Sequence, residues 1–231
     1  MYTSHTNDIR KNSPPAFDTI FVQVSKQEDF SCKKKGLNRK ELEKECNSWA
    51  RKISESYQPD LIIYIAKGGY LIGREMREVF DVPMIGIGTS RDGNNFKEKI
   101  GPFVSMLPNF VRNILISIEM KSNKHGRNTE RHVHFLDDII IKIDAKTIKS
   151  ILVAEDSVDT GHSLKQSLDA IKKVFPQAEV KVASLNVWDK SKNIVSVDYS
   201  LYQNTIIKAP MSKDSKEYKA FIKLYDDETK N

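Results

Sequence analysis

The chain has 231 residues, with 37 Lys and Arg against 31 Asp and Glu, so its formal net charge is +6 and its pI is about 9.1. A hydrophobic fraction of 39% and a charged fraction of 29% exclude an intrinsically disordered or collagen-like chain, and no apolar run approaches the ~18 residues of a membrane span. Two cysteines, Cys32 and Cys46, form neither a disulfide framework nor a zinc site and fit a reducing compartment. The mild basic excess favours anionic partners, but we expect neither nucleic acid nor a membrane as a partner.

The first part of the chain is polar. Residues 1–16 contain Pro14 and Pro15 and predict a loose arm, and they lack the apolar core of a signal peptide, so we expect a cytoplasmic protein. Residues 17–24 alternate between apolar and polar types, which predicts a strand. Residues 25–36 contain three consecutive lysines, and we expect a loop there.

A helix is predicted next, from Asn38 to about Ser56. Asn38 is a suitable N-cap because Glu41 follows three residues later, as in a capping box. The residues expected on the buried face of this helix are Leu42, Cys46, Trp49, Ile53 and Tyr57.

Residues 61–88 have the pattern of a βαβ unit. The apolar run 61–66 suits a parallel strand that is buried on both faces. Residues 67–69 (KGG) break the run, residues 70–80 have a helical pattern, and a second apolar run covers 84–88. Strand, loop, helix and strand in this order predict two parallel neighbouring strands.

Residues 91–149 have a less regular pattern. We expect a polar loop at 90–99, an amphipathic helix at 109–121, an exposed basic segment at 122–131 and a pair of strands within 132–143.

The regular pattern returns at Ser150. A buried strand at 151–154 ends in two acids, a tight loop follows at 159–163, and a helix at 164–175 precedes Pro176. The remaining predicted elements are strands at 179–188, 197–202 and 205–207 and a short helix at 218–225.

Residues 151–164 (ILVAEDSVDTGHSL) place chemically useful groups at a strand end. In open α/β sheets, ligands bind at the carboxyl ends of the strands, and the first turn of a helix offers backbone N–H groups and a positive dipole to a phosphate. Thr160 and Ser163 add hydroxyl donors, and Gly161 permits close backbone approach. Since Glu155 and Asp156 could bind sugar hydroxyls, one site would hold a phosphate and a ribose together.

The same segment resembles the phosphoribosyl diphosphate motif of type I phosphoribosyltransferases, in which four apolar residues, two acids and two mostly apolar residues precede D-T-G-x-S/T. Ala154 departs mildly from the motif, because a larger apolar residue is usual there. Residues 65–69 (IAKGG) are similar to the pyrophosphate loop of the purine branch, which includes the xanthine-guanine and hypoxanthine enzymes. The similar stretches, 37–90 and 150–188, cover well over a third of the chain.

The resemblance implies an α/β fold with a doubly wound parallel sheet, a hood and a long insertion. Residues 17–231 would form a single domain, with a flap or insertion at 91–149 and hood elements at 189–231. The implied reaction depends on Mg²⁺: phosphoribosyl diphosphate loses pyrophosphate from C1 of its ribose, and an acceptor nucleophile, in most relatives a base nitrogen, takes its place. Relatives of this kind are commonly homo-oligomers, and we expect one here.

The resemblance also implies roles for individual residues. Glu155 and Asp156 would hold the ribose hydroxyls, directly or through Mg²⁺ and water, and Asp159 would be the candidate general base near the base nitrogen. Arg91 would belong to a flap over the transition state. The loop that would bind the 5′-phosphate is Asp159, Thr160, Gly161, His162 and Ser163. The backbone amides that would bind pyrophosphate belong to Lys67, Gly68 and Gly69, in a loop that often has a cis peptide bond in this family.

The acceptor side departs from the purine pattern. Trp188 stands where purine enzymes have a lysine that contacts the exocyclic oxygen of the base, and Ile206 stands where they have an aromatic residue that stacks on it. Both are candidates for the acceptor pocket. A purine-like base is the leading acceptor. The alternatives are a non-purine acceptor such as a sugar hydroxyl, and a non-catalytic regulator that binds phosphoribosyl diphosphate or a nucleotide.

Overall fold

The computed structural model describes residues 32–90, 132–136 and 144–229. Several predictions from the sequence concern other parts of the chain and lie outside the described residues. They are the N-terminal arm, the strand at 17–24, the polar loop after Ser90, the helix at 109–121, the basic segment at 122–131, Arg91 and the second strand of the pair within 132–143.

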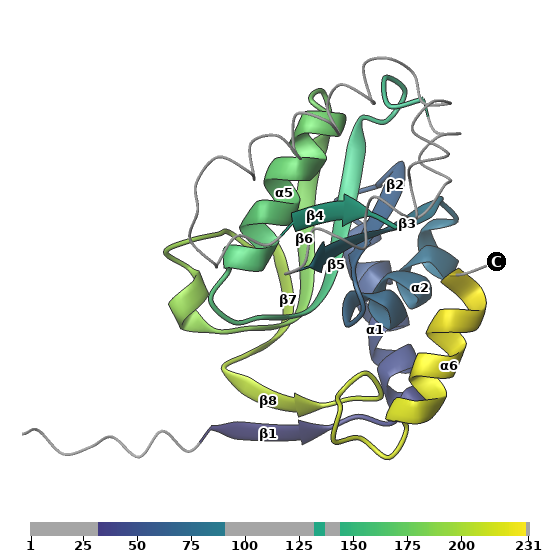
Figure 1. The fold of residues 1–231 in the computed structure, drawn as a ribbon, viewed down its shortest axis with the longest axis vertical. Helices are drawn as coiled ribbons and strands as arrows, with labels where there is room; N and C mark the ends of the chain where they lie inside the picture. The colour runs from purple at the N-terminus through teal and green to yellow at the C-terminus, as the bar shows by residue number, and fades with distance from the viewer. Residues whose placement is uncertain (1–31, 91–131, 137–143, 230–231) are drawn as a thin grey trace, which may run out of the picture. The chain divides into compact units, whose positions relative to one another are not determined.

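A six-stranded sheet forms the centre of the described structure, in the order β4-β3-β2-β5-β6-β7 (Figure 1). Neighbouring strands are parallel except β4, which runs antiparallel to β3. The strands of this sheet are β2 (Leu61–Ile65), β3 (Met84–Ser90), β4 (His132–Phe135), β5 (Ser150–Val158), β6 (Glu179–Val187) and β7 (Tyr199–Gln203). The predicted α/β fold and its central parallel sheet are confirmed.

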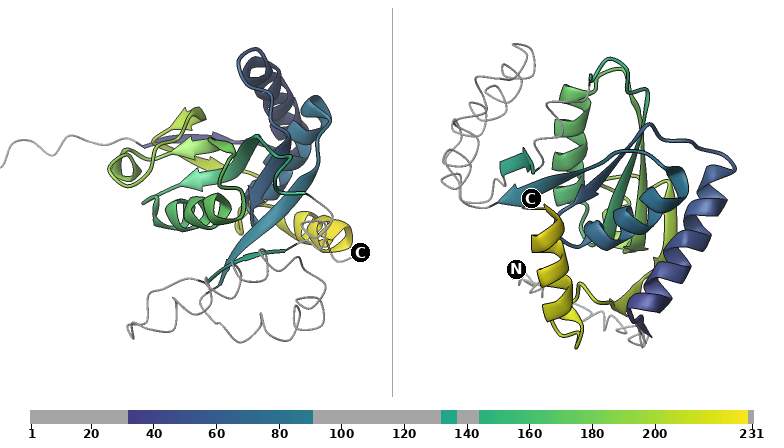
Figure 2. Two further views of the ribbon diagram at one scale, coloured as in Figure 1. Left: turned by 90° about the horizontal axis from the view of Figure 1, so that it is seen from above. Right: turned by 90° about the vertical axis from the view of Figure 1, so that its right-hand side faces the viewer.

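Helices cover both faces of this sheet. They are α1 (Arg39–Ser54), α2 (Gly69–Phe80), α5 (His162–Val174) and α6 (Tyr218–Thr229), and a short 3₁₀ turn spans Asp189–Ser191. Alternate residues of β2 belong to different cores: Ile62 and Tyr64 pack with α1, α2 and α6, whereas Ile63 and Ile65 pack with α5. Figure 2 shows the two groups of helices separated by the sheet. None of the helices in the described ranges has the length and apolar character of a membrane span.

Local sequence signals account for the first helix. The side chain of Asn38 accepts a hydrogen bond from the Glu41 N–H at 3.0 Å, and Glu41 accepts one from the Asn38 N–H at 2.8 Å, so the predicted capping box is present. The predicted face is buried: Leu42, Cys46, Trp49, Ile53 and Tyr57 are all at most 6% exposed. The βαβ unit of β2, α2 and β3 is likewise confirmed, with β2 and β3 parallel.

A second sheet corrects one prediction. Residues 33–36 were expected to lie in a loop, but they form β1 (Lys33–Gly36), which pairs in parallel with β8 (Thr205–Lys208). The burial pattern of β1 is exposed throughout, so it lacks the apolar alternation by which a strand is predicted. The strand exists because β8, which is distant in the sequence, supplies its hydrogen-bonding partner.

Several other elements differ in length from the prediction. Helix α1 ends at Ser54 rather than at about Ser56, and β3 continues to Ser90 rather than ending at 88. Strand β5 does not end at the two acids but continues through them to Val158, because β6 pairs with it as far as the Val158 and Val187 positions. Helix α5 begins at His162, two residues earlier than predicted, and α6 continues to Thr229 rather than ending at 225.

Candidate active site

The carboxyl ends of β2 and β5 bring two predicted loops together. The two strands are adjacent and parallel, with Tyr64 opposite Ala154. The loop after β2 therefore lies against the end of β5, and its peptide bond between Ala66 and Lys67 is cis, as the resemblance implies.

The contact is too close for any side chain on the loop glycines. A Cβ atom at Gly68 would overlap the carboxylate of Asp156, and one at Gly69 would overlap the backbone oxygen of Ala154. Glycine at these two positions lets the loop backbone approach the part of β5 that contains the acid pair.

The two neighbouring acids have different environments. Glu155 is 7% exposed, and its Oε1 accepts the Asp156 N–H at 2.9 Å. Burial, and then the negative charge of Asp156, raise the pKa of Glu155 well above the usual 4.5. Asp156 is half-buried, and its Oδ1 accepts the Ser157 N–H at 2.8 Å. Asp156 is therefore the acid of the pair that solvent and a ligand reach more easily.

Asp159 stands beyond the end of the strand. It is exposed, and its Oδ1 accepts a hydrogen bond from the Ser157 hydroxyl at 3.4 Å. Its exposure leaves the carboxylate accessible to a ligand.

The turn into α5 combines a left-handed glycine with a helix terminus that has no side-chain cap. Gly161 has φ +83°, in the left-handed region, and a Cβ there would crowd Val195. Gly161 is the N-cap, so no side chain caps the first turn, and that turn contains no acidic residue. Thr160 and His162 are exposed and Ser163 is half-buried beside this helix terminus, whose dipole favours an anion.

A pocket of about 190 Å³ adjoins the end of β5. Both acceptor candidates line it: Trp188, whose backbone N–H donates to the Val158 oxygen at 3.0 Å, and Ile206, which is 48% exposed. Asp156 lines it as well. The other lining residues are Ser157, Leu185, Asn186, Thr205, Ile207, Ala209, Met211 and Ser212.

Three comparisons with known proteins bear on this arrangement. The sequence model of the phosphoribosyl transferase domain matches residues 37–213, which is more than three quarters of the chain. The chain belongs to this family. A search of curated proteins finds no match to this phosphoribosyltransferase.

Solved structures share its fold. A purine phosphoribosyltransferase from Pyrococcus horikoshii Ot3 is 20% identical with a TM-score of 0.51, and the match covers 79% of this chain and 95% of that one. The xanthine-guanine-hypoxanthine phosphoribosyltransferase of Helicobacter pylori is 16% identical with a TM-score of 0.51, with coverage of 80% and 97%. At these identities the likeness shows a common fold, and the acceptor has to be argued from the pocket.

The acids of this phosphoribosyltransferase fit Mg²⁺ only in a shared site. Among the residues that the structure describes, no group of three or more His, Cys, Asp or Glu side chains could hold a metal ion by itself. Mg²⁺ keeps several waters and binds through one or two carboxylates plus substrate oxygens. The half-buried Asp156 fits that manner of binding, whereas Glu155 is buried and has a raised pKa, so it fits better as a support for the strand end.

The structure thus gathers most of the predicted site at one edge of the sheet, except that the ammonium of Lys67 extends toward α6, 3.8 Å from Asp226. The sequence reasoning missed Asn186, which lines the pocket and is 1% exposed. Its Oδ1 accepts the Thr205 N–H at 3.1 Å, so the amide nitrogen is the group of this side chain that is left for a ligand. The available signal was an asparagine inside an apolar strand near its carboxyl end.

Proposed function

We propose that the protein transfers the 5-phosphoribosyl group of phosphoribosyl diphosphate to a purine-like base and releases pyrophosphate. The observation that carries this proposal is the position of Asp156. Its carboxylate lies so close to Gly68 of the pyrophosphate loop that a Cβ on Gly68 would overlap it. Asp156 also lines the 190 Å³ pocket. The donor loops and the pocket therefore adjoin at one carboxylate, where C1 of the ribose would have to lie.

Each part of the donor then has a partner in this chain. The 5′-phosphate lies at the start of α5 on residues 159–163, the ribose hydroxyls lie on Asp156 with Glu155 behind it, and pyrophosphate lies on the backbone amides of residues 67–69. Asp156 would hold Mg²⁺ together with waters and donor oxygens, and the bound ion would neutralise part of the charge on the leaving pyrophosphate.

The transfer needs no reactant other than phosphoribosyl diphosphate and the acceptor. The lone pair of the acceptor nitrogen forms a bond to C1 as the bond between C1 and the pyrophosphate oxygen breaks, and the electrons of that bond leave with pyrophosphate. The proton of the acceptor nitrogen passes to the carboxylate of Asp159. Pocket walls of Trp188, Ile206 and Met211 suit a flat heterocycle, since stacking on an aromatic side chain is worth about 1–3 kcal/mol per base.

One observation favours a second candidate acceptor, such as a sugar hydroxyl. Among the residues that the structure describes, no lysine or arginine lines the pocket. Lys190 lies nearby, with its ammonium 5.7 Å from the centroid of the Trp188 ring. A purine oxygen would meet the neutral amide of Asn186 in place of a cation, which weakens the preference for oxopurines. A regulator that binds the donor without turnover stays the third candidate.

The remaining expectations are proposals of the same kind. We place the protein in the cytoplasm because its described cysteines, Cys32 and Cys46, are free thiols, which suits a reducing compartment. A homo-oligomer with no nucleic acid or membrane partner, a single domain over 17–231, a flap at 91–149 and a hood at 189–231 stay predictions. Ile206 and Met211, which line the pocket, belong to the segment 189–231.

The experiment is a screen for pyrophosphate release from labelled phosphoribosyl diphosphate with Mg²⁺ and a panel of purines, other heterocycles and sugars. Turnover with a purine, lost in Asp156→Asn and Asp159→Asn but kept in the α5 surface variant Asp169→Asn, supports the proposal. Turnover with sugars alone favours the second candidate. Donor binding without turnover across the panel favours the regulator, and equal activity of all three variants contradicts the site.

A further inference from the structure

Helix α6 lies outside the residues that the family model matches, which end at 213, and it lies beside α2, the helix that follows the predicted pyrophosphate loop (Figure 1). Tyr225, 6% exposed, is central to the packing of α6. Its ring meets the rings of Tyr70 and Tyr64 edge-on, at centroid distances of 5.1 and 6.4 Å. Tyr64 belongs to β2 and Tyr70 to α2, the two elements that flank residues 66–68.

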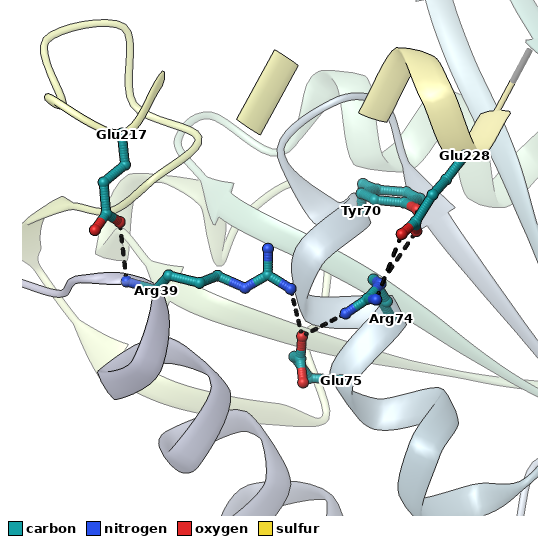
Figure 3. A network of polar contacts seen from close by, with 6 residues as sticks. All are labelled: Arg39, Tyr70, Arg74, Glu75, Glu217 and Glu228. Carbon is teal, nitrogen blue, oxygen red and sulfur yellow. Dashed lines mark hydrogen bonds and ion pairs between the residues drawn. The ribbon is translucent and has the colours of Figure 1, made fainter. Parts of the chain in front are cut away.

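Polar contacts fix α6 near both of its ends. The carboxylate of Glu217, the residue before the helix, accepts the backbone N–H of Arg39 at 2.9 Å. Near the other end, Glu228 accepts hydrogen bonds from the Tyr70 hydroxyl and from Arg74 Nε, the latter at 3.1 Å (Figure 3). The helix is thereby attached to the first turn of α1 and to the first two turns of α2.

The second half of α6 contacts the predicted pyrophosphate loop itself. The Lys67 ammonium lies 3.8 Å from Asp226 Oδ1 and 4.9 Å from the centroid of the Tyr225 ring. The next residue, Gly68, lies close to the Asp156 carboxylate. Two consecutive loop residues therefore contact different elements, Lys67 the helix α6 and Gly68 the strand β5, and these contacts restrict the backbone between them.

We propose that Asp226 is a positioning residue, which with Tyr225 holds Lys67 so that the backbone amides of residues 67–69 are aligned for pyrophosphate before the donor binds. This inference rests on the proposed function of these residues. Because the amides and not the ammonium make the pyrophosphate site, Lys67 keeps its contacts with α6 when the donor is bound. A loop that is already ordered loses less entropy on binding. An exposed ion pair and a cation–π contact are individually weak, so the effect is about three- to tenfold in donor affinity.

The test measures the dissociation constant of phosphoribosyl diphosphate with Mg²⁺ by titration calorimetry on the full chain, without an acceptor. Asp226→Asn is expected to weaken binding about three- to tenfold, and Asp226→Glu, which keeps the charge, to restore most of it. The matched control is Asp169→Asn, which removes an ion pair with Lys165 on α5 whose two side chains are 56% and 59% exposed. It should bind as the wild-type protein does.

A double-mutant cycle separates positioning from general destabilisation of α6. If Asp226 acts through Lys67, then Asp226→Asn has no further effect on binding in a Lys67→Gln background. Hydrogen exchange of the amides at 67–69 in the free protein should be faster in Asp226→Asn.

Three results would overturn the inference: unchanged affinity in Asp226→Asn, tighter binding, which would mean that Asp226 competes with the donor for Lys67, or additive effects in the double variant. Those results leave the proposed function intact, since the wild-type protein still binds the donor. Wild-type protein that binds no donor overturns the proposed function, and this inference with it.

Discussion

The close contact between Gly68 and the carboxylate of Asp156 gives the sharpest prediction. A methyl group at Gly68 would overlap the carboxylate of Asp156, whose oxygens and carbon are the nearest atoms to that position. Gly68→Ala should therefore push Asp156 away from the loop, or push the loop away from the strand. In either case the two halves of the donor site separate, and donor binding is lost before the fold is.

The loss of stability in Gly68→Ala depends on whether Asp156 or the loop moves. Rotating Asp156 breaks the hydrogen bond from the Ser157 N–H at 2.8 Å, and hydrogen bonds to charged groups are worth about 1.5–3 kcal/mol. Moving the loop instead is an overpacking change, which costs about 1–3 kcal/mol. For a chain of this size, a free energy of unfolding lowered by about 1–3 kcal/mol lowers the Tm by roughly 2–12 °C.

Thermal unfolding and calorimetric titration with phosphoribosyl diphosphate and Mg²⁺ measure the two effects separately. Gly36→Ala is the matched control, because a Cβ at Gly36 meets no heavy atom within 4 Å. The control should keep both the wild-type Tm and the wild-type affinity. Gly68→Ala should lose affinity by at least tenfold, about 1.4 kcal/mol, at a temperature where it is fully folded. A Gly68→Ala protein that matches the control in both measurements would refute the contact.

Three further predictions concern stability and thiol reactivity. Glu75 is 3% exposed and accepts hydrogen bonds from two half-exposed arginines. Glu75→Gln should therefore lower the free energy of unfolding, measured by urea denaturation, by about 1–3 kcal/mol. An unchanged urea midpoint would contradict a stabilising role for Glu75. Burial acts to raise the pKa of Asp60, but hydrogen bonds from residues 149–150 outweigh burial and hold this pKa below the usual 3.8. A pKa lowered by folding stabilises the protein above pH ~3.8. Because Asp60 is exposed and solvent screens its contacts, Asp60→Asn should be less stable at pH 7 by at most about 1 kcal/mol, and this difference should close as the pH falls below ~3.8. Burial, and then the negative charge of Glu75, raise the pKa of Cys46 to about 12, so at pH 8 a thiol reagent should titrate only Cys32 in the native protein and both cysteines in denaturant.

The parts of the fold that the sequence predicts are those whose signals are local. The capping box of α1, the apolar runs of β2 and β5 and the D-T-G-x-S loop each lie within a few consecutive residues. The physical requirement of each, such as a cap, a buried strand or a glycine in the left-handed region, acts on those same residues. Because parallel strand ends meet at one edge, local elements were enough to place the donor loops beside the acid pair.

The parts that it does not predict depend on partners that are distant along the chain. The final residues of α6 are charged and look like a polar tail, but Glu228 accepts hydrogen bonds from Tyr70 and Arg74, and these contacts accompany a helix that is four residues longer than predicted. Strand β5 passes through its two acids for a similar reason, since pairing with β6 continues beyond them.

The acceptor pocket depends both on local sequence signals and on partners that are distant along the chain. This explains why the identity of the acceptor is the hardest part of the function to derive. Trp188 follows the end of β6, whereas Ile206 belongs to β8, and Ile206 pairs in register with Lys34 of β1. The position of the Ile206 side chain is therefore set by a strand of lysines that has no strand signal in the sequence. A substitution that disrupts the pairing of β1 with β8 should alter acceptor choice and leave donor binding intact, because the donor loops belong to β2 and β5.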